Sequence, residues 1–323
     1  MLRHITVFVA ALAIAGCTGG TSGSPEPEKG RDASGDYRSA LPDDERAQLE
    51  YFDSIRAMDP CALLADSAID AIGTPSLFAP GLTTAECAVR FDPSAGPNSI
   101  ARIDASIEAG AISIGGDEPR SIAGRDAIVH TLTSGTCVGY VPIDDVATVH
   151  YAISRIGDGD VCPQLIDVMT ASLPALETKP PRESSRHWQP TTLDRVDPCG
   201  VIGALGVGDD PYVNGAVATC DFALDGGASA PRISINNKYD PTFVYANPSA
   251  VALEISGVPA IEAPAGESCS INLGVGHDRP LGSPDPDNDS ERIEAVLLRA
   301  PSCDEARDVA VEVARLYAEE RQR

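Results

Sequence analysis

The sequence predicts an α+β protein of two tandem homologous domains, each a mainly antiparallel sheet with N- and C-terminal helices and two disulfides. Three observations support this prediction: the motif Asp-Pro-Cys occurs twice, eight cysteines fall into two sets of four, and short β-branched runs alternate with turn-forming residues. Strands and helices do not alternate regularly, which disfavours a doubly wound fold.

The cysteine count predicts four disulfide bonds. Nine cysteines are present, and if Cys17 carries lipid, an even eight remain in a chain expected to reach an oxidising compartment. Four cysteines allow three connectivities per domain, so the sequence alone does not decide the pairing. We favour first with second and third with fourth, because each pair ties a helix to a neighbouring strand. The favoured pairs are Cys61 with Cys87, Cys137 with Cys162, Cys199 with Cys220, and Cys269 with Cys303.

The second half of the chain repeats the pattern of the first. Residues 58–64, Met-Asp-Pro-Cys-Ala-Leu-Leu, correspond to 196–202, Val-Asp-Pro-Cys-Gly-Val-Ile. In both halves the second and third cysteines each begin an apolar run typical of a strand, and a glycine-marked segment precedes the third. The fourth cysteine begins a C-terminal helix, predicted at 162–176 and at 303–318.

Each domain is predicted to begin with a helix capped by the aspartate of Asp-Pro-Cys. Aspartate accepts hydrogen bonds from the free amides of a first helical turn, and proline fits that turn because its missing N–H is not needed there. The strands expected between the helices are 87–91, 100–107, 127–133, 137–141 and 148–153, then 220–224, 232–238, 269–273 and 292–298.

Composition divides the chain into five segments. They are a signal peptide at 1–16, a flexible tether at 17–45, a first domain at 46–176, a linker at 177–195 and a second domain at 196–323. The tether and the linker are rich in proline and polar residues, so both are expected to be unstructured. Trp188, the only tryptophan, lies in the linker, where we expect it to pack into a seam between the domains rather than to bind a ligand.

The N-terminus has the pattern of a bacterial lipoprotein signal. Ile14-Ala15-Gly16-Cys17 follows a short apolar run behind Arg3, and in such signals the cysteine takes a diacylglyceryl group and becomes the new N-terminus. The apolar run is too short to span a membrane, which needs about 20 apolar residues. The alternative is an ordinary cleaved signal with a free cysteine nearby. We predict acylation at Cys17, for example with palmitate, and attachment to the extracytoplasmic side of the cell membrane.

The strongly acidic charge restricts the partners. The formal charge is -24, or -25 if Arg3 is removed with the signal. Such a surface repels phosphate backbones and anionic headgroups, so nucleic acid is not an expected partner. Contact with the bilayer is expected through the acyl chains on Cys17.

These features resemble a family of actinobacterial envelope lipoproteins of unassigned function, whose domain opens with Asp-Pro-Cys, and related sensor-like extracellular domains of mycobacteria. The resemblance rests on residues 59–61 and 197–199, the order of the cysteines and the lipoprotein signal. It covers most of the chain after about Ala57, in two copies. It implies a compact α+β domain held by two disulfides, and it brings no catalytic residues.

No motif indicates catalysis, a cofactor or a metal site. The nucleophile-elbow, zinc-protease and phosphate-loop motifs are missing from the sequence, and no two cysteines have the C-x-x-C spacing of zinc sites. The acidic stretch 285–291 is similar to half of a calcium loop, but Ser290 and Val296 stand where that loop needs glycine and glutamate. A solvated acidic loop is the stronger interpretation.

Other candidate groups are weaker still. The pairs Asp144-Asp145 and Asp209-Asp210 are adjacent, and neighbours on a strand point to opposite faces. The four histidines of the mature chain do not cluster in the sequence, and a surface position is expected for each: His130, His150, His187 and His277.

The predicted function is a lipid-anchored cell-envelope binding or interaction module that is not an enzyme. Duplication without catalytic chemistry supports it, because tandem domains can form a cleft at their junction or add avidity. Its expected partner is an envelope lipid, glycan or protein. The alternatives are an envelope hydrolase or transferase with a site assembled from distant residues, and a structural or sensory accessory lipoprotein. An apolar pocket shared by the domains would favour the binding module.

Overall fold

The computed structural model describes residues 37–92, 94, 96, 99–110, 118–143, 145–188, 190–240, 249–281 and 292–323. The predicted signal peptide, Cys17, Asp144 and the acidic stretch 285–291 lie outside the described residues. The contacts group Ser34–Arg323 into one unit. None of the helices in the described part of the chain combines the length and the hydropathy that a membrane span requires.

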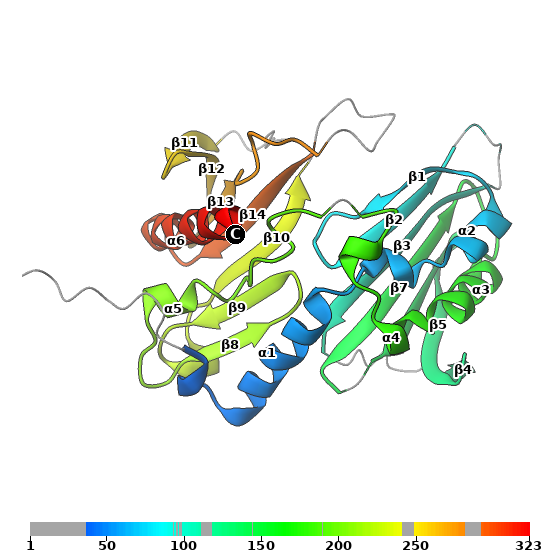
Figure 1. Ribbon diagram of the computed structural model, residues 1–323, viewed down its shortest axis with the longest axis horizontal. Coiled ribbons are helices and arrows are strands. Elements are labelled where there is room, and N and C mark those ends of the chain that lie inside the picture. The colour runs from blue at the N-terminus through cyan, green and yellow to red at the C-terminus, as the bar shows by residue number, and fades with distance from the viewer. Residues whose placement is uncertain are drawn as a thin grey trace, which may run out of the picture. The chain divides into compact units, whose positions relative to one another are not determined.

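Seven antiparallel strands form a sheet within the described part of the first half (Figure 1). They are β1 (Pro75–Pro80), β2 (Glu86–Phe91), β3 (Ile100–Ala109), β4 (Arg120–Ile122), β5 (Arg125–Thr133), β6 (Thr136–Pro142) and β7 (Ala147–Arg155). Their order across the sheet is β1-β2-β3-β7-β6-β5-β4. Helix α3 (Cys162–Ser172) packs on β5, β6 and β7, and the 3-10 helix η2 (Pro60–Leu63) packs on β2 and β3.

A second sheet, again of seven antiparallel strands among the residues described, occupies the second half. Its strands are β8 (Tyr212–Gly215), β9 (Thr219–Ala223), β10 (Ile233–Asp240), β11 (Val251–Ile255), β12 (Val258–Ala265), β13 (Ser268–Leu273) and β14 (Ile293–Ala300). The order is β11-β12-β13-β14-β10-β9-β8. The long helix α6 (Cys303–Gln322) packs on β11 to β14, as Figure 1 shows. The described chain is therefore mainly β, with some helix.

The two sheets have the same topology. If the described strands of each half are numbered in chain order from β1 and from β8, both sheets have the same spatial order: first, second, third, seventh, sixth, fifth, fourth. The hairpin between the fourth and fifth strands also agrees, because Ala123 and Gly124 have φ of 50° and 80°, and Ser256 and Gly257 have φ of 51° and 80°. Two consecutive positive φ values are typical of a type I′ turn, with glycine favoured at the second position.

Four disulfides occupy matching places in the two halves. Cys61 of η2 is joined to Cys87 of β2, and Cys199, just before the short helix α5 (Ile202–Leu205), is joined to Cys220 of β9. The other two bonds join a strand to the start of a C-terminal helix, Cys137 to Cys162 and Cys269 to Cys303. These are the four pairs that we favoured from the sequence.

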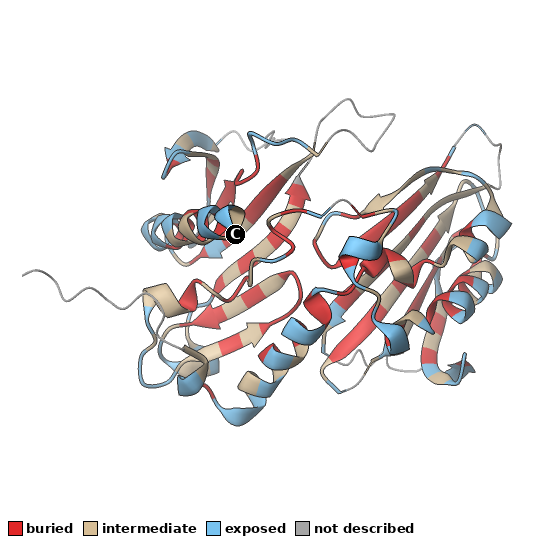
Figure 2. Cartoon of the chain, viewed as in Figure 1, coloured by how far each residue is buried: buried red, intermediate tan, exposed pale blue. Residues whose placement is uncertain are grey.

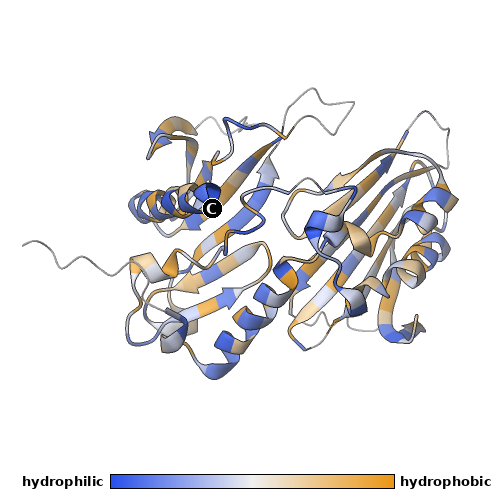
Figure 3. Ribbon diagram, viewed as in Figure 1, coloured by the Kyte–Doolittle hydropathy of each residue, from blue (hydrophilic) through white to orange (hydrophobic). Residues whose placement is uncertain are grey.

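Each sheet has its own hydrophobic core, and Figure 2 shows buried residues along both sheets and on one side of α6. Tyr151, Ile103 and Leu165 are fully buried in the first core, and Phe222 and Ile271 in the second. The apolar stripe of α6 alternates with hydrophilic residues along the helix (Figure 3). Its buried members are Ala306, Val309, Ala310, Val313, Ala314 and Tyr317.

The helix predictions need three corrections. The helix expected at 162–176 ends at Ser172, because Pro174 interrupts it before the short helix α4 (Ala175–Thr178). The helix expected at 303–318 continues to Gln322. The capped helix expected at the start of each domain is shorter than predicted. In the first half it is the 3-10 helix η2, followed by α2 (Asp66–Ile72). In the second half it is a turn followed by α5, because glycines 200, 203 and 206 disfavour a longer helix.

The predicted tether is wrong at its C-terminal end. Tyr37–Ala40 form the 3-10 helix η1, and Asp43–Arg56 form helix α1, so residues 37–45 are structured. Helix α1 buries Leu49, Phe52 and Ile55 at helical spacing. Leu49 belongs to the second core, whereas Phe52 and Ile55 belong to the first. Helix α1 therefore joins the two halves.

Helix α1 also covers the edge of the second sheet. Glu45 accepts a hydrogen bond from the amide of Val213 at 3.1 Å, and Gln48 donates to the carbonyl of Gly215 at 3.1 Å. An uncovered edge strand is an open template for pairing with another chain. The side chains of α1 occupy that edge at β8.

The predicted linker is also structured. Its backbone pairs with the end of the α1 segment, because the amide of Asp59 donates to the carbonyl of Pro180 at 2.8 Å and the amide of Arg182 donates to Ala57 at 3.0 Å. Residues Arg182–Ser184 form the 3-10 helix η4. The expectation of an unstructured linker at 177–195 is therefore wrong, while Trp188 is buried and its ring meets Tyr239 of β10 edge to face at 6.0 Å.

Candidate functional site

Both Asp-Pro-Cys motifs cap a turn in the same way. Oδ1 of Asp59 accepts a hydrogen bond from the amide of Cys61 at 2.9 Å, and Oδ1 of Asp197 accepts one from Cys199 at 3.0 Å. This bond satisfies an amide that has no partner within the turn. The local role of the motif is therefore common to the two halves.

The second motif also takes part in a closed ring of ion pairs. Asp197 accepts Nη2 of Arg38 on Oδ2 at 2.9 Å and Nη1 of Arg56 on Oδ1 at 3.2 Å. Asp53 faces the same two guanidinium groups, at 2.5 Å from Nη1 of Arg38 and 3.3 Å from Nη2 of Arg56. Two arginines and two aspartates thus alternate around the ring, which links the N-terminal segment to the second half.

Asp197 is held in its ionised form. Its burial would raise the pKa, but Arg56, the amide of Cys199 and Arg38 outweigh burial and keep the pKa below its ordinary value. Burial raises the pKa of the neighbouring Tyr37, and the charge of Asp197 adds to the effect, so this hydroxyl stays protonated. Tyr37 can therefore donate to Oδ2 of Asp197, which lies 3.4 Å away.

A second polar network fixes the linker. Asp194 is buried and accepts four hydrogen bonds, from Nη1 of Arg182 at 2.7 Å, Nε1 of Trp188 at 2.8 Å, the amide of Thr191 at 2.9 Å and the hydroxyl of Tyr239 at 2.6 Å. Both oxygens of this carboxylate are satisfied, as a buried charge requires. The linker therefore has one arrangement against the first core and β10.

Arg182 ties this network to the first half. Its Nε donates to the carbonyl of Arg56 at 2.8 Å and its Nη2 to the carbonyl of Thr84 at 2.6 Å, while the guanidinium lies 4.3 Å from the centre of the Trp188 ring. All three nitrogens are in use and the residue is 4% exposed. Arg182 is a structural residue of the junction.

Between the two networks lies a pocket of about 340 Å³. Its walls come from the segment around α1, from the linker and from the second Asp-Pro-Cys motif. The lining residues are Arg38, Asp53, Arg56, Ala57, Arg182, Glu183, Pro190, Thr191, Asp194, Arg195 and Asp197. We call this cavity the junction pocket. Its volume lies within the range of small-molecule sites, about 300–1,000 Å³.

A second cavity, of about 400 Å³, belongs to the first half alone. Ala71, Phe91, Arg155 and Gln164 contribute to its walls. It is bounded by α2, α3 and the ends of neighbouring strands, and no residue of the second half lines it. The junction pocket is the better candidate, because Arg38 and Arg56 of the N-terminal segment and Asp197 of the second half line it together.

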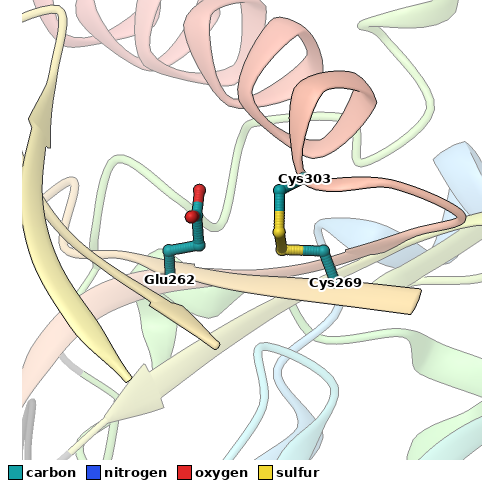
Figure 4. A group of neighbouring side chains, drawn as sticks. All are labelled: Glu262, Cys269 and Cys303. Atoms are coloured by element: carbon teal, nitrogen blue, oxygen red, sulfur yellow. A yellow bond between two sulfur atoms is a disulfide. The ribbon is translucent and has the colours of Figure 1, made fainter. Parts of the chain in front are cut away.

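One group of residues within the described chain has the spacing of metal ligands but not the chemistry. Glu262 lies beside the sulfurs of Cys269 and Cys303 (Figure 4). These sulfurs form a disulfide, whereas a metal ligand must be a thiolate. The Glu262 carboxylate is bound by both Nε and Nη2 of Arg307, at 2.7 and 2.8 Å. This cluster therefore stabilises the contact between β12 and α6.

The histidines lie apart, with one exception. The pairing of β5, β6 and β7 places His130 and His150 on either side of Tyr140. The centre of the Tyr140 ring lies 6.2 Å from that of His130 and 4.8 Å from that of His150. His187 stacks on Phe78 at 3.6 Å, and its Nε2 lies 2.6 Å from Asp66. Nδ1 of His150 likewise lies 3.3 Å from the carboxylate of Glu108. The fourth, His277, contacts the carbonyl of Gly274 at 3.1 Å.

Asp209 and Asp210 lie in a bend before β8, and the amide of Asp210 donates to Asp225 at 3.2 Å. Asp145 of the other pair lies in the bend before β7.

The residues that build the junction pocket were not recognised from the sequence, apart from the cap role of Asp197. Arg38 and Arg182 lie in segments that composition marks as unstructured. The signal that could have shown α1 is the spacing of Leu49, Phe52 and Ile55 after three acidic residues, which is typical of an amphipathic helix. The ion pairs themselves have no local signal, because Arg38 and Asp197 are 159 residues apart.

The chain matches none of the protein-family models, curated proteins or solved structures with which it was compared.

Proposed function

We propose that this protein is a lipid-anchored cell-envelope binding module that recognises an envelope lipid, glycan or partner protein and is not an enzyme. Acylation at Cys17 holds it on the extracytoplasmic face of the membrane, and the folded unit presents the junction pocket. The observation that carries the proposal is the junction pocket itself. Three segments, each structured by contacts across the junction, surround a cavity of ligand size.

We further propose that the two halves are homologous α+β domains produced by duplication, and that they belong to the envelope lipoproteins whose domain opens with Asp-Pro-Cys. The shared strand order and the matching disulfides support the duplication. Similar hairpins at Gly124 and Gly257 support it independently. A shared ancestor explains why the same cap occurs at Asp59 and Asp197.

The four disulfides support export. Such bonds persist in oxidising compartments and are rare in reducing ones. Substitution of Cys17 by serine tests the anchor: we expect the variant to leave the membrane fraction and to lose incorporation of labelled palmitate. Membrane retention and labelling of the Cys17→Ser protein would contradict lipidation at this residue.

The binding function is tested by native mass spectrometry of the full chain, extracted from membranes of an actinobacterial host in mild detergent. We expect a species heavier than the acylated polypeptide, which reverts to the polypeptide mass on denaturation. The added mass would identify a lipid or a glycan. A native mass equal to the denatured mass would contradict carriage of a small envelope ligand.

A further inference from the structure

Two arginines of the junction pocket are arranged as a receptor for an oxyanion. Asp197 contacts one nitrogen of Arg38 and one of Arg56, and so holds the two guanidinium groups side by side. Their other terminal nitrogens, Nη1 of Arg38 and Nη2 of Arg56, both point to the carboxylate of Asp53. The planar guanidinium groups of two arginines can bind the oxygens of a carboxylate or a phosphate in this arrangement.

Asp53 is the more replaceable of the two carboxylates. Its side chain is 40% exposed, whereas that of Asp197 is 23% exposed. Asp197 also accepts the amide of Cys199, which binds it to the backbone of its own motif. Asp53 is held by its two ion pairs with Arg38 and Arg56, at 2.5 and 3.3 Å.

We propose that Asp53 occupies the place of a ligand oxyanion, and that the junction pocket binds a small molecule whose carboxylate or phosphate group displaces Asp53 from Arg38 and Arg56. This inference rests on the proposed function, because it takes the junction pocket as the ligand site. The rest of the ligand lies along Ala57 and Pro190, which also line the pocket. Elsewhere the acidic surface of the protein repels anions, so an anionic ligand depends on the two arginines for its binding.

Removal of Asp53 tests the proposal as a gain of binding. Equilibrium dialysis at constant ionic strength measures radiolabelled inorganic phosphate and, in a second arm, radiolabelled succinate against the full chain in detergent. For Asp53→Ala we expect Kd to fall about tenfold for at least one of these ions, because the internal competitor is gone. Gain with phosphate alone identifies a phosphate ligand, and gain with succinate alone identifies a carboxylate ligand.

Asp43→Ala is the matched control. Asp43 lies on the same helix and also pairs with an arginine, Arg46, but neither residue lines the pocket. This control changes the net charge equally, so we expect its Kd to equal that of the wild type. An equal gain in both variants, or no gain in Asp53→Ala, would overturn the proposal. Addition of Arg56→Gln to Asp53→Ala is expected to abolish the gain, and Asp53→Asn repeats the test with a side chain of the same shape.

The outcome separates this inference from the proposed function. A co-purified ligand together with no gain in Asp53→Ala would leave the binding module standing and reject the oxyanion site. A gain in Asp53→Ala together with a bare native mass would establish the oxyanion site and reject carriage of an envelope ligand.

Discussion

The two Asp-Pro-Cys motifs form the same cap, but the pKa values of their aspartates are shifted in opposite directions. Asp59 is buried near Ser185 and Arg182 of the linker, and burial raises its pKa above the ordinary value. Asp197 lies between Arg38 and Arg56, which lower its pKa despite burial. The cap is a property of the motif, whereas the charge state depends on the segment that packs in front of it. Of the two capping aspartates, Asp197 lines the junction pocket and Asp59 does not.

The strongest test of the common local role is removal of the first disulfide in each half. The bonds Cys61–Cys87 and Cys199–Cys220 close loops of similar length, with sequence separations of 26 and 21. We expect replacement of either pair by alanine to lower the free energy of unfolding by about 3 kcal/mol. Chemical denaturation measures both variants, and strongly unequal losses would break the equivalence of the two halves.

The contact between α1 and the second half is tested at Gly215. A Cβ there would meet Leu49 at 2.3 Å and the sulfur of Cys199 at 3.0 Å. Gly215→Ala is therefore expected to cost about 1–3 kcal/mol and to speed hydrogen exchange in residues 43–56. At Gly139 the atoms nearest to an added Cβ are side-chain atoms of α3, first the sulfur of the flexible Met169 at 2.6 Å.

Gly139→Ala is thus the matched control for Gly215→Ala. It adds the same methyl group to a strand beneath a helix, but we expect exchange in 43–56 to stay at the wild-type rate. Equal exchange in the two variants would show that α1 does not depend on its contact with β8.

Amide substitutions sharpen the comparison of the two aspartates. Asn caps a turn as well as Asp does, so Asp197→Asn and Asp59→Asn each keep the cap and remove the charge. We expect Asp197→Asn to lose about 1–2 kcal/mol, because two arginines lose their carboxylate partner. Asp59→Asn is expected to change stability by less than about 0.5 kcal/mol, because burial already disfavours its charge. Urea unfolding distinguishes the two, and equal losses would contradict the difference in environment.

The pH dependence of the unfolding free energy is the smallest expected effect, and its sign differs between the two aspartates. The lowered pKa of Asp197 means that its stabilisation is complete above the ordinary carboxyl pKa of about 3.8 and is lost as pH falls through the lower folded value. The raised pKa of Asp59 has the opposite sign, since the cost of its charge disappears as pH falls through the raised value.

Between pH 7 and pH 3, the stability of the wild type relative to Asp197→Asn should therefore fall only near the acid end. Relative to Asp59→Asn it should rise on acidification. Unfolding free energies at several pH values measure both trends, and parallel curves for the two variants would contradict the account.

Local patterns were sufficient for the caps, the disulfide pairs and nine of the described strands, but they did not reveal β1, β4, β8, β11 or β12. Each cysteine lies at the start of a predicted strand or helix, or in the Asp-Pro-Cys cap, so neighbouring elements could be paired. The ends of the helices were less accurate, because Pro174 and the glycines after Cys199 act against an otherwise helical pattern.

The candidate site could not be predicted in the same way. Its arginines lie in polar, proline-containing segments whose composition is that of a solvated chain. Their charges are satisfied by partners outside their own helical turns: Asp197, 159 residues away, pairs with Arg38, and Asp194, 12 residues away, pairs with Arg182. Such pairs leave no periodic pattern, so a single sequence does not reveal them.

The most direct test of the account fills the junction pocket. Ala57 is exposed and lines it, and Ala71 is exposed and lines the cavity of the first half. Native mass spectrometry of the full chain compares Ala57→Phe with the control Ala71→Phe and the wild type. The account predicts that Ala57→Phe alone loses the co-purified ligand while remaining folded. Retention of the ligand by Ala57→Phe, or its loss from Ala71→Phe, would contradict a ligand site at the junction.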